Sequence, residues 1–381
     1  METNATIMAG IPATNAALYH AIRFRVGDPV AFINVNGKST LILRDIEMHR
    51  AKQHARTDNV ACPADFEPSD GLSGDRETAT AQAAAEFLRQ HSVTSVVGDR
   101  SLPLIFAEII QQQGIEVRCD LEKGVKERRA KDEQEIEWLR QAQSVTEGAI
   151  RLACERIANA NARADGVLMH QGAELTSESV RSEVDIWLMK QGFKTVPSII
   201  ACGPDGADCH NLGSGPLRTG SPVIVDIFPQ NQETGYNGDC TRTVVHGEIS
   251  EEVNRMHAAV VEAKKAGEQT TKAGVTAENV HKAVIAKIKE HGFDIGVPED
   301  SQPDEYCAMV HGTGHGIGLD VHEPPLLDFK GPELICGEAL TIEPGLYSKA
   351  IGGIRIEDMV IVTESGYESL NSLPEGLDWK T

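Results

Sequence analysis

The pattern of apolar and polar positions first predicts a series of short alternating elements over residues 1–125. Apolar or alternating runs typical of strands lie at 28–35, 40–43, 95–98 and 115–117. Asn36-Gly37, between the first two runs, is a strong signal for a two-residue hairpin turn. Residues 80–90 and 102–113 have helical patterns, so this part of the chain is predicted to be a small α/β domain.

The second part, residues 126–381, is dominated by longer amphipathic helices. Apolar residues recur every three or four positions from Ile136 to Ile157, which predicts a helix with one buried stripe. Further helices are predicted at 177–190, 251–270 and 277–291, and strands at 223–227, 241–245, 339–343, 353–357 and 359–362. Because helices and strands are segregated rather than strictly alternating, this domain is predicted to be α+β.

Composition and charge then narrow the class of protein. Hydrophobic residues make up 40% of the 381 residues, which excludes a disordered chain. The formal net charge of −21 argues against a nucleic-acid partner. No apolar run approaches the ~20 residues that span a bilayer, and no secretory signal is visible. With eight scattered cysteines and no CxxC pair, we expect reduced thiols, a cytoplasmic location and no membrane association.

Carboxylates placed among apolar strand residues are the first candidate chemistry. Asp226 follows Val-Ile-Val, and a carboxylate buried there is unfavourable unless it is paired or bound to a metal ion. Asp239 precedes the returning strand of the same apparent hairpin, so the two carboxylates can lie together. Taken alone, this pair is equally well explained by a structural role such as an ion pair with Arg242.

A segment rich in glycine and histidine follows, with the sequence HGTGHGIGLDVHE. It contains His311, His315 and His322, and its glycines allow the backbone to approach a ligand closely. It fits neither a GxGxxG nor a GxxxxGK[ST] phosphate loop, and an HExxH zinc helix is absent. The simplest alternative is a surface loop with incidental histidines.

Two glutamates end predicted strands nearer the C-terminus. Period-two alternation places Leu340 and Ile342 on one face of their strand and Glu343 on the other. By the same argument Glu357 shares a face with Arg355, and a surface ion pair between them is the alternative explanation. The pattern therefore directs one carboxylate from each strand away from an apolar face.

Together these residues form an oxygen-rich donor set for divalent metal ions, consisting of Asp226, Asp239, His315, Glu343 and Glu357. One ion would leave two negative charges uncompensated, whereas two ions neutralise all four carboxylates. We therefore expect two divalent ions, Mn²⁺ first and Co²⁺, Zn²⁺ or Fe²⁺ as alternatives. A pair of ions ~3.5–4 Å apart also clamps a bridging water and lowers its pKa. Without metal, repulsion between the carboxylates would raise their pKa values.

The motifs, in this order, resemble those of the pita-bread metallopeptidases, which include methionine aminopeptidase, aminopeptidase P, prolidase and creatinase. The resemblance runs from about residue 131 to 366, through EIEWLRQA, SIIACGPDGADCHN, HGTGHGIGLDVHE and IEPGLY. It implies a pita-bread catalytic domain over residues 126–381, preceded by a creatinase-type N-terminal α/β domain over residues 1–125. Simple methionine aminopeptidases lack that first domain, which favours hydrolysis of Xaa-Pro bonds.

The resemblance also implies roles for the candidate metal ligands. Asp226 would chelate the first ion, and Asp239 and Glu357 would bridge both ions. His315 and Glu343 would hold the second ion. Glu343 would in addition act as a catalytic residue, carrying a proton between the bridging water and the leaving group.

The other matched residues would act around the substrate. His322 and His210 would be catalytic and substrate-binding residues that polarise the scissile carbonyl or steady the developing oxyanion. His311 would be a further substrate-binding residue. Arg355 would orient Asp239 or a bridging carboxylate from behind.

The implied function is a dinuclear metal-dependent peptidase that hydrolyses Xaa-Pro bonds through a metal-bridging hydroxide, similar to Xaa-Pro dipeptidase. An Xaa-Pro aminopeptidase acting on longer peptides is the alternative. A metal-independent creatinase-like hydrolase and a non-catalytic binding module fit less well, because all five candidate ligands are present. The substrates would be proline-containing peptides, and the resemblance implies a homodimer. The thirteen-residue spacing from Asp226 to Asp239 is about two residues longer than is usual, which can reshape the pocket rim.

Overall fold

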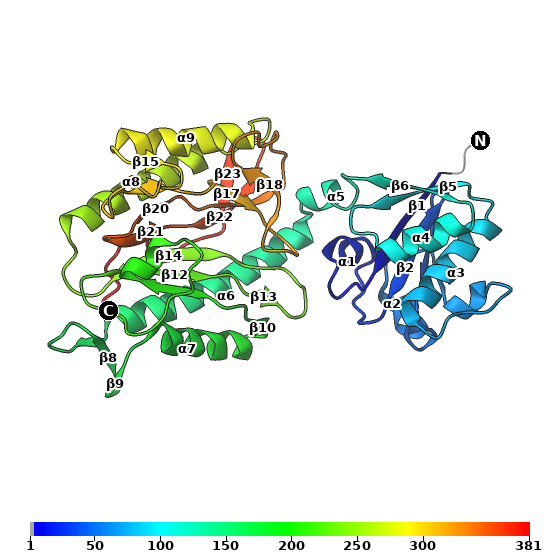
Figure 1. Ribbon diagram of the computed structural model, residues 1–381, viewed down its shortest axis with the longest axis horizontal. Helices are drawn as coiled ribbons and strands as arrows, with labels where there is room; N and C mark the ends of the chain where they lie inside the picture. Colours follow the sequence, from blue (N-terminus) through cyan, green and yellow to red (C-terminus); the bar gives the residue numbers. More distant parts are fainter. Residues whose placement is uncertain (1–3) are drawn as a thin grey trace. The chain divides into compact units, whose positions relative to one another are not determined.

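The structure is a computed structural model that describes residues 4–381 (Figure 1). It divides into two compact units, Met1–Arg128 and Arg129–Thr381. The division lies close to the position near residue 125 predicted from the sequence. Within the described part of the chain, no helix combines the length and apolar character that a membrane span requires.

The first unit is a six-stranded mixed sheet with helices packed on it. The strand order is β4-β3-β2-β1-β5-β6, with β1, β2 and β3 antiparallel and the remaining pairs parallel. The strands are β1 Ala5–Gly10, β2 Val30–Val35, β3 Lys38–Ile42, β4 Asn59–Ala61, β5 Ser95–Asp99 and β6 Glu116–Asp120, and the helices are α1 Ala16–Ile22, α2 Met48–His54, α3 Arg76–Gln90, α4 Leu104–Gln112 and α5 Lys126–Arg129. The expected turn joins β2 and β3, with positive φ at both Asn36 and Gly37.

Four helices of the second unit begin at side chains that cap their first turn. They are α6 Glu133–Ala158, α7 Ser177–Lys190, α8 Glu251–Thr270 and α9 Ala277–Glu290. Asp132, Thr176, Ser250 and Thr276 each accept a hydrogen bond from a backbone N–H of the following turn. In Figure 1 most of the strands of this unit lie between the α6–α7 pair and the α8–α9 pair.

The strands of the second unit form several small sheets. The longer strands are β11 Ile199–Cys202, β12 Pro222–Ile227, β14 Cys240–Val245, β17 Gly314–Gly316, β18 Glu323–Leu327, β19 Ala339–Ile342, β20 Gly345–Ser348, β21 Gly352–Arg355, β22 Asp358–Val362 and β23 Tyr367–Ser369. The shorter ones are β7 Asn161–Ala162, β8 Leu168–His170, β9 Ala173–Glu174, β10 Phe193–Lys194, β13 Gln230–Asn231, β15 Asp294–Ile295 and β16 Ala308–Met309. Three sheets supply the central layer, in the orders β11-β12-β14, β18-β17-β19-β22-β23 and β15-β16-β20-β21.

Residues 371–377 pack back onto this central layer and have no regular secondary structure. The side chain of Arg242 on β14 donates to the carbonyl oxygens of Leu373 (3.3 Å) and Pro374 (3.0 Å). The same guanidinium donates to the carbonyl oxygen of Glu357 at 2.6 Å and to Asp358 Oδ1 at 2.8 Å. Arg242 is fully buried, so it links three distant parts of the chain inside the unit.

Candidate metal centre

Strands β12 and β14 place two of the predicted ligands side by side. The strands are antiparallel, with Asp226 opposite Thr241, so Asp239 lies just beyond the end of the paired region. The side-chain amide of Gln143 on α6 bonds both to the N–H of Asp239 (2.9 Å) and to its carbonyl oxygen (2.7 Å). Helix α6 therefore fixes the backbone that carries Asp239.

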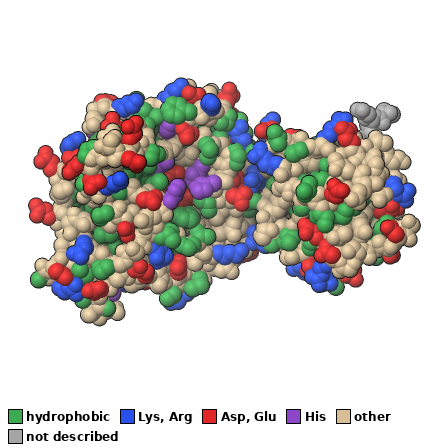
Figure 2. All heavy atoms as spheres, in the orientation of Figure 1, with side chains coloured by type: hydrophobic (Ala, Val, Ile, Leu, Met, Phe, Trp, Pro, Cys, Tyr) green, Lys and Arg blue, Asp and Glu red, His purple; other side chains and the backbone are tan. Residues whose placement is uncertain are grey.

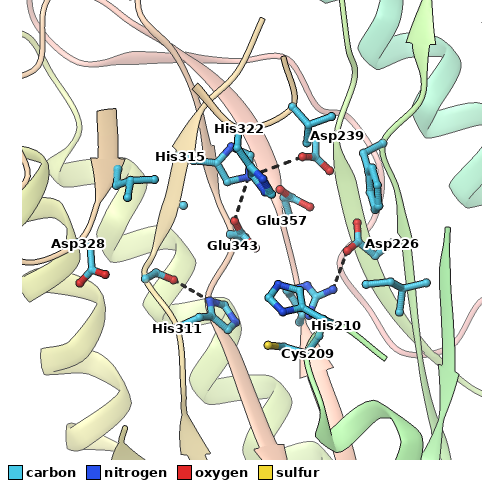
Figure 3. A pocket seen from close by; sticks show the side chains of 17 residues that line it. Cys209, His210, Asp226, Asp239, His311, His315, His322, Asp328, Glu343 and Glu357 are labelled. Atoms are coloured by element: carbon cyan, nitrogen blue, oxygen red, sulfur yellow. Dashed lines mark hydrogen bonds and ion pairs between the residues drawn. The ribbon is translucent and has the colours of Figure 1, made fainter. Parts of the chain in front are cut away.

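A cavity of about 440 Å³ brings together every residue that the sequence singled out. Figure 2 shows histidine side chains gathered at one place on the surface of the second unit, and Figure 3 shows the interior of the cavity. The predicted residues among its lining are Asp226, Asp239, His315, Glu343 and Glu357, together with His210, His311, His322 and Arg355.

Three of the predicted ligands form a compact group. Asp239, His315 and Glu357 each offer a donor atom within 4.8 Å of the others, and all three residues are buried. The Nε2 atom of His315 lies 3.8 Å from Asp239 Oδ2 and 3.3 Å from Glu343 Oε1 (Figure 3). Glu343 therefore lies next to this group and contacts it at His315.

Three acids of the cavity, Asp239, Glu343 and Glu357, have raised pKa values. Burial, followed by the negative charge of neighbouring carboxylates, raises the pKa of Asp239 and of Glu357 well above the usual values. Burial raises the pKa of Glu343 to about 7 and, together with His322, lowers the pKa of His315 to about 4. The rise expected from repulsion is therefore found, with burial as its larger cause. Divalent cations would compensate these charges and release the protons.

Asp226 tests whether the donor set fits a metal ion. Its Oδ2 atom accepts a hydrogen bond from Arg355 Nη2 at 2.7 Å. Its Oδ1 atom is buried and has no hydrogen-bond partner. An unpartnered buried oxygen is unfavourable, and a cation in the cavity would satisfy it. The residues present therefore fit a divalent metal centre.

Arg355 bonds directly to Asp226, which was not among the carboxylates predicted as its partners, namely Asp239 or another bridging carboxylate. It donates to Asp226 and not to Asp239, and it also donates to the Tyr347 hydroxyl at 2.8 Å. It reaches Glu357 through Thr241, whose hydroxyl bonds to Arg355 Nε (3.3 Å) and to Glu357 Oε2 (2.8 Å). The direct bond to Asp226 was not predicted, because strand alternation does not specify that Arg355, at the end of β21, projects towards β12.

The imidazole of His311 is engaged within the protein. Its Nδ1 atom donates to the carbonyl oxygen of Gly312 at 2.7 Å, and its Nε2 atom lies 2.7 Å from the Tyr347 hydroxyl. Burial lowers the pKa of His311 to about 4, so the ring is neutral and Nε2 accepts from Tyr347. Both ring nitrogens of His311 are thus engaged, and its substrate-binding role stays a prediction. Tyr347 was not singled out from the sequence, although it ends the IEPGLY motif.

His210 and His322 line the cavity with exposed side chains. His210 follows a short 3-10 helix, Gly203–Ala207, and His322 lies in the loop between β17 and β18. The ring of His322 packs edge-on against that of His315, with centroids 4.3 Å apart. Both histidines are accessible to a molecule that enters the cavity, as their expected roles require.

Three buried carboxylates, the partly exposed Glu343 and a cluster of histidines around one cavity define a protein of the metal-dependent hydrolase class. The sequence profile of metallopeptidase family M24 matches residues 137–364. The chain belongs to this family.

Comparison with known proteins finds relatives that are described as dipeptidases. The Xaa-Pro dipeptidase of Pyrococcus furiosus is 31% identical over 245 residues, covering 63% of this chain and 62% of the relative. The "Probable dipeptidase PepE" of Mycobacterium tuberculosis is 37% identical over 206 residues, covering 53% of this chain and 51% of the relative. The chain thus matches less than two thirds of the length of either protein.

Solved structures are similar over almost the whole chain. The Xaa-Pro dipeptidase from Bacillus anthracis has a TM-score of 0.80 at 23% identity, covering 98% of this chain and 94% of that one. The prolidase from Pyrococcus horikoshii has a TM-score of 0.77 at 24% identity, covering 98% and 95%. These likenesses confirm the predicted fold, a pita-bread domain preceded by a smaller α/β domain.

Proposed function

We propose that the chain is a metal-dependent peptidase that hydrolyses Xaa-Pro bonds, with Xaa-Pro dipeptides as the first candidate substrates. The observation that carries this proposal is a cavity in which a metal donor set adjoins two exposed histidines. The name of the P. furiosus relative, an Xaa-Pro dipeptidase, supports this substrate class, and the name of the M. tuberculosis relative, a probable dipeptidase, supports dipeptides.

Five residues would hold two divalent metal ions, Mn²⁺ by preference, namely Asp226, Asp239, His315, Glu343 and Glu357. Ions bound there supply a water of lowered pKa and a Lewis acid for a carbonyl oxygen. The carboxylates fit this role because their buried oxygens need compensating positive charge.

The protein's own side chains would then move the proton and steady the developing charge. Glu343 lies on the cavity wall beside His315, where its carboxylate can take a proton from water and return it to the leaving nitrogen. Proline nitrogen is a tertiary amide and needs that proton to leave. His322 and His210 present their rings to the carbonyl oxygen of the bound peptide and stabilise its negative charge.

We further propose a cytoplasmic location and a homodimeric assembly. All eight cysteines are free, which is consistent with a reducing compartment. The homodimer is supported by the resemblance to prolidases.

Hydrolysis of an Xaa-Pro dipeptide and of an Xaa-Pro-Yaa tripeptide, each with Mn²⁺, Co²⁺ or Zn²⁺, tests the proposal. We expect the dipeptide to be cleaved with Mn²⁺ and the Glu343→Gln variant to stay folded and lose turnover. Preference for the tripeptide would favour an aminopeptidase. Turnover of neither peptide with any of the ions, or a Glu343→Gln variant of nearly full activity, would contradict the proposal.

A further inference from the structure

The loop of residues 317–322 joins β17 to β18 and carries His322 into the cavity. Glu323, the next residue, points its side chain back into this loop and not into the cavity. We propose that Glu323 is a positioning residue for His322, because its buried carboxylate holds the loop in one conformation. This inference rests on the proposed function, which gives His322 its role at the substrate.

The carboxylate of Glu323 closes the loop on itself. Its Oε1 atom accepts hydrogen bonds from the backbone N–H groups of Leu319 (2.9 Å) and Asp320 (3.1 Å). Gly318 leaves room for the carboxylate, since a Cβ atom there would lie 3.0 Å from both carboxylate oxygens. The loop therefore wraps around the side chain of Glu323, and charge-assisted bonds of this kind are stronger than neutral ones.

A buried cation compensates the charge of this carboxylate. Lys131 Nζ lies 3.0 Å from Glu323 Oε2, and the two side chains are only 3% and 2% exposed. A buried charge without a partner would be strongly unfavourable, so the pair confines Glu323 to this position. The loop is thereby tied to the chain just before α6.

The same loop is also attached to the hairpin that carries two candidate metal ligands. Asn237 donates to the carbonyl oxygen of Gly318 through its backbone N–H (2.9 Å) and its side-chain amide (2.8 Å). Gln230 donates to the carbonyl oxygen of Leu319 at 3.1 Å. Both donors lie between Asp226 and Asp239. The loop is thus held on one side by this hairpin and on the other by Glu323, which fixes His322 relative to the metal centre.

A second ion pair in the same part of the chain provides a matched control. Arg129 pairs with Glu338, whose side chain is 1% exposed, and also donates to the carbonyl oxygen of Glu333 at 2.7 Å. This pair, like the one made by Lys131, joins the segment before α6 to a distant loop. The loop of Glu338, residues 328–338, carries no candidate metal ligand and no histidine, and Asp328 at its start is its one cavity residue. If loss of an ion pair acted only by weakening the fold, breaking either pair would therefore have a similar effect.

The test compares Glu323→Gln with Glu338→Gln, alone and combined with His322→Ala. Glutamine keeps the shape of Glu323 but cannot accept from two backbone N–H groups and from Lys131 at once. We expect Glu323→Gln to speed amide hydrogen exchange in residues 317–322 and to lower kcat/KM roughly 10- to 100-fold. Glu338→Gln should change neither the amide hydrogen exchange of residues 317–322 nor kcat/KM.

The combined variant separates positioning from general stability. If Glu323 acts through His322, adding Glu323→Gln to His322→Ala should lower kcat/KM by less than about twofold. Multiplicative effects, or unchanged exchange in residues 317–322, would overturn the proposal. Should the wild type cleave no Xaa-Pro peptide, the proposed function fails, and the exchange measurement still decides whether Glu323 holds the loop.

Discussion

A chain of hydrogen-bonded side chains runs behind the candidate metal ligands. His311 accepts from the Tyr347 hydroxyl, the hydroxyl accepts from Arg355, and Arg355 donates to Asp226. Tyr347 is 4% exposed, and its single hydroxyl joins the buried Arg355 to the half-buried His311. At the scale of the residue, the orientation of Asp226 thus depends on side chains that bind no metal themselves.

Replacing Tyr347 with Phe should destabilise the fold, because Arg355 Nη1 and His311 Nε2 each lose a partner in a buried place. We expect the free energy of unfolding to fall by about 1–3 kcal/mol, measured by equilibrium denaturation in urea. Tyr306→Phe removes a hydroxyl from a half-exposed tyrosine and serves as the control. Equal free energies of unfolding for wild type and Tyr347→Phe would show that the hydroxyl does not stabilise the fold.

Glu86 in α3 should make stability depend on pH. Hydrogen bonds from Arg89 and then Gln90 lower the pKa of Glu86 from its usual 4.5 to about 2. A carboxylate with a lowered pKa contributes stability that is complete above pH 4.5 and is lost as the pH falls towards 2. The difference in Tm between wild type and Glu86→Gln should therefore be larger at pH 7 than at pH 3.5. A difference independent of pH would contradict this assignment.

At the scale of the element, the contact between α6 and the start of β14 has no spare room. A Cβ atom on Gly238 would lie 2.2 Å from Thr146 Oγ1 and 2.8 Å from the carbonyl oxygen of Ala142. Thr146 is itself held by that carbonyl at 2.9 Å, so it cannot turn away freely. Only glycine lets Asp239 approach Gln143 as closely as it does.

Gly238→Ala should therefore push β14 away from α6 and displace Asp239. We expect a loss of about 1–3 kcal/mol in the free energy of unfolding, as for other overpacked sites. Mn²⁺ binding, measured by isothermal titration calorimetry, should weaken in the same variant. Gly376→Ala is the control, since a Cβ atom there meets nothing within 4 Å. If both variants bind Mn²⁺ as tightly as wild type, the spacing of these elements does not matter for the site.

How well each element could be predicted depends on whether its signal is local. Helices α7 and α8 have the predicted bounds because Thr176 and Ser250 cap them and apolar stripes mark their buried faces. Strand β1 was not predicted, because Ala5–Gly10 has neither alternation nor a flanking turn signal. Its pairing with β2 and β5 determines it, and those partners are distant in sequence.

The same distinction applies to the candidate site. Alternation placed Glu343 and Glu357 on the side of their strands away from Leu340 and Ile354, and both glutamates line the cavity. The partner of Arg355 could not be predicted, because Asp226 is 129 positions away in the chain. The Lys131–Glu323 pair spans 192 positions and is equally invisible to local patterns.

At the scale of the whole molecule, metal binding should stabilise the fold. The buried acids repel one another without a cation, and any ligand that binds only the folded state raises its stability. At a free Mn²⁺ concentration about 100 times the dissociation constant, the gain is about 2.7 kcal/mol. Differential scanning calorimetry should show a rise in Tm that EDTA reverses. The rise should vanish in Asp239→Asn and persist in Asp300→Asn, whose carboxylate is exposed. A rise of equal size in all three proteins would place the ion elsewhere.

The contacts of the buried Arg242 guanidinium determine when part of the second unit can finish folding during synthesis. It joins the carbonyl oxygen of Glu357 to those of Leu373 and Pro374, so the hydrogen bonds that hold the Glu357 backbone are incomplete until residue 374 has been translated. The ribosome adds residues one at a time from the N-terminus, so Asp226 and Asp239 are synthesised long before the hydrogen bonds of Arg242 can form. A nascent chain therefore cannot complete this set of hydrogen bonds around the Glu357 backbone until synthesis has passed residue 374.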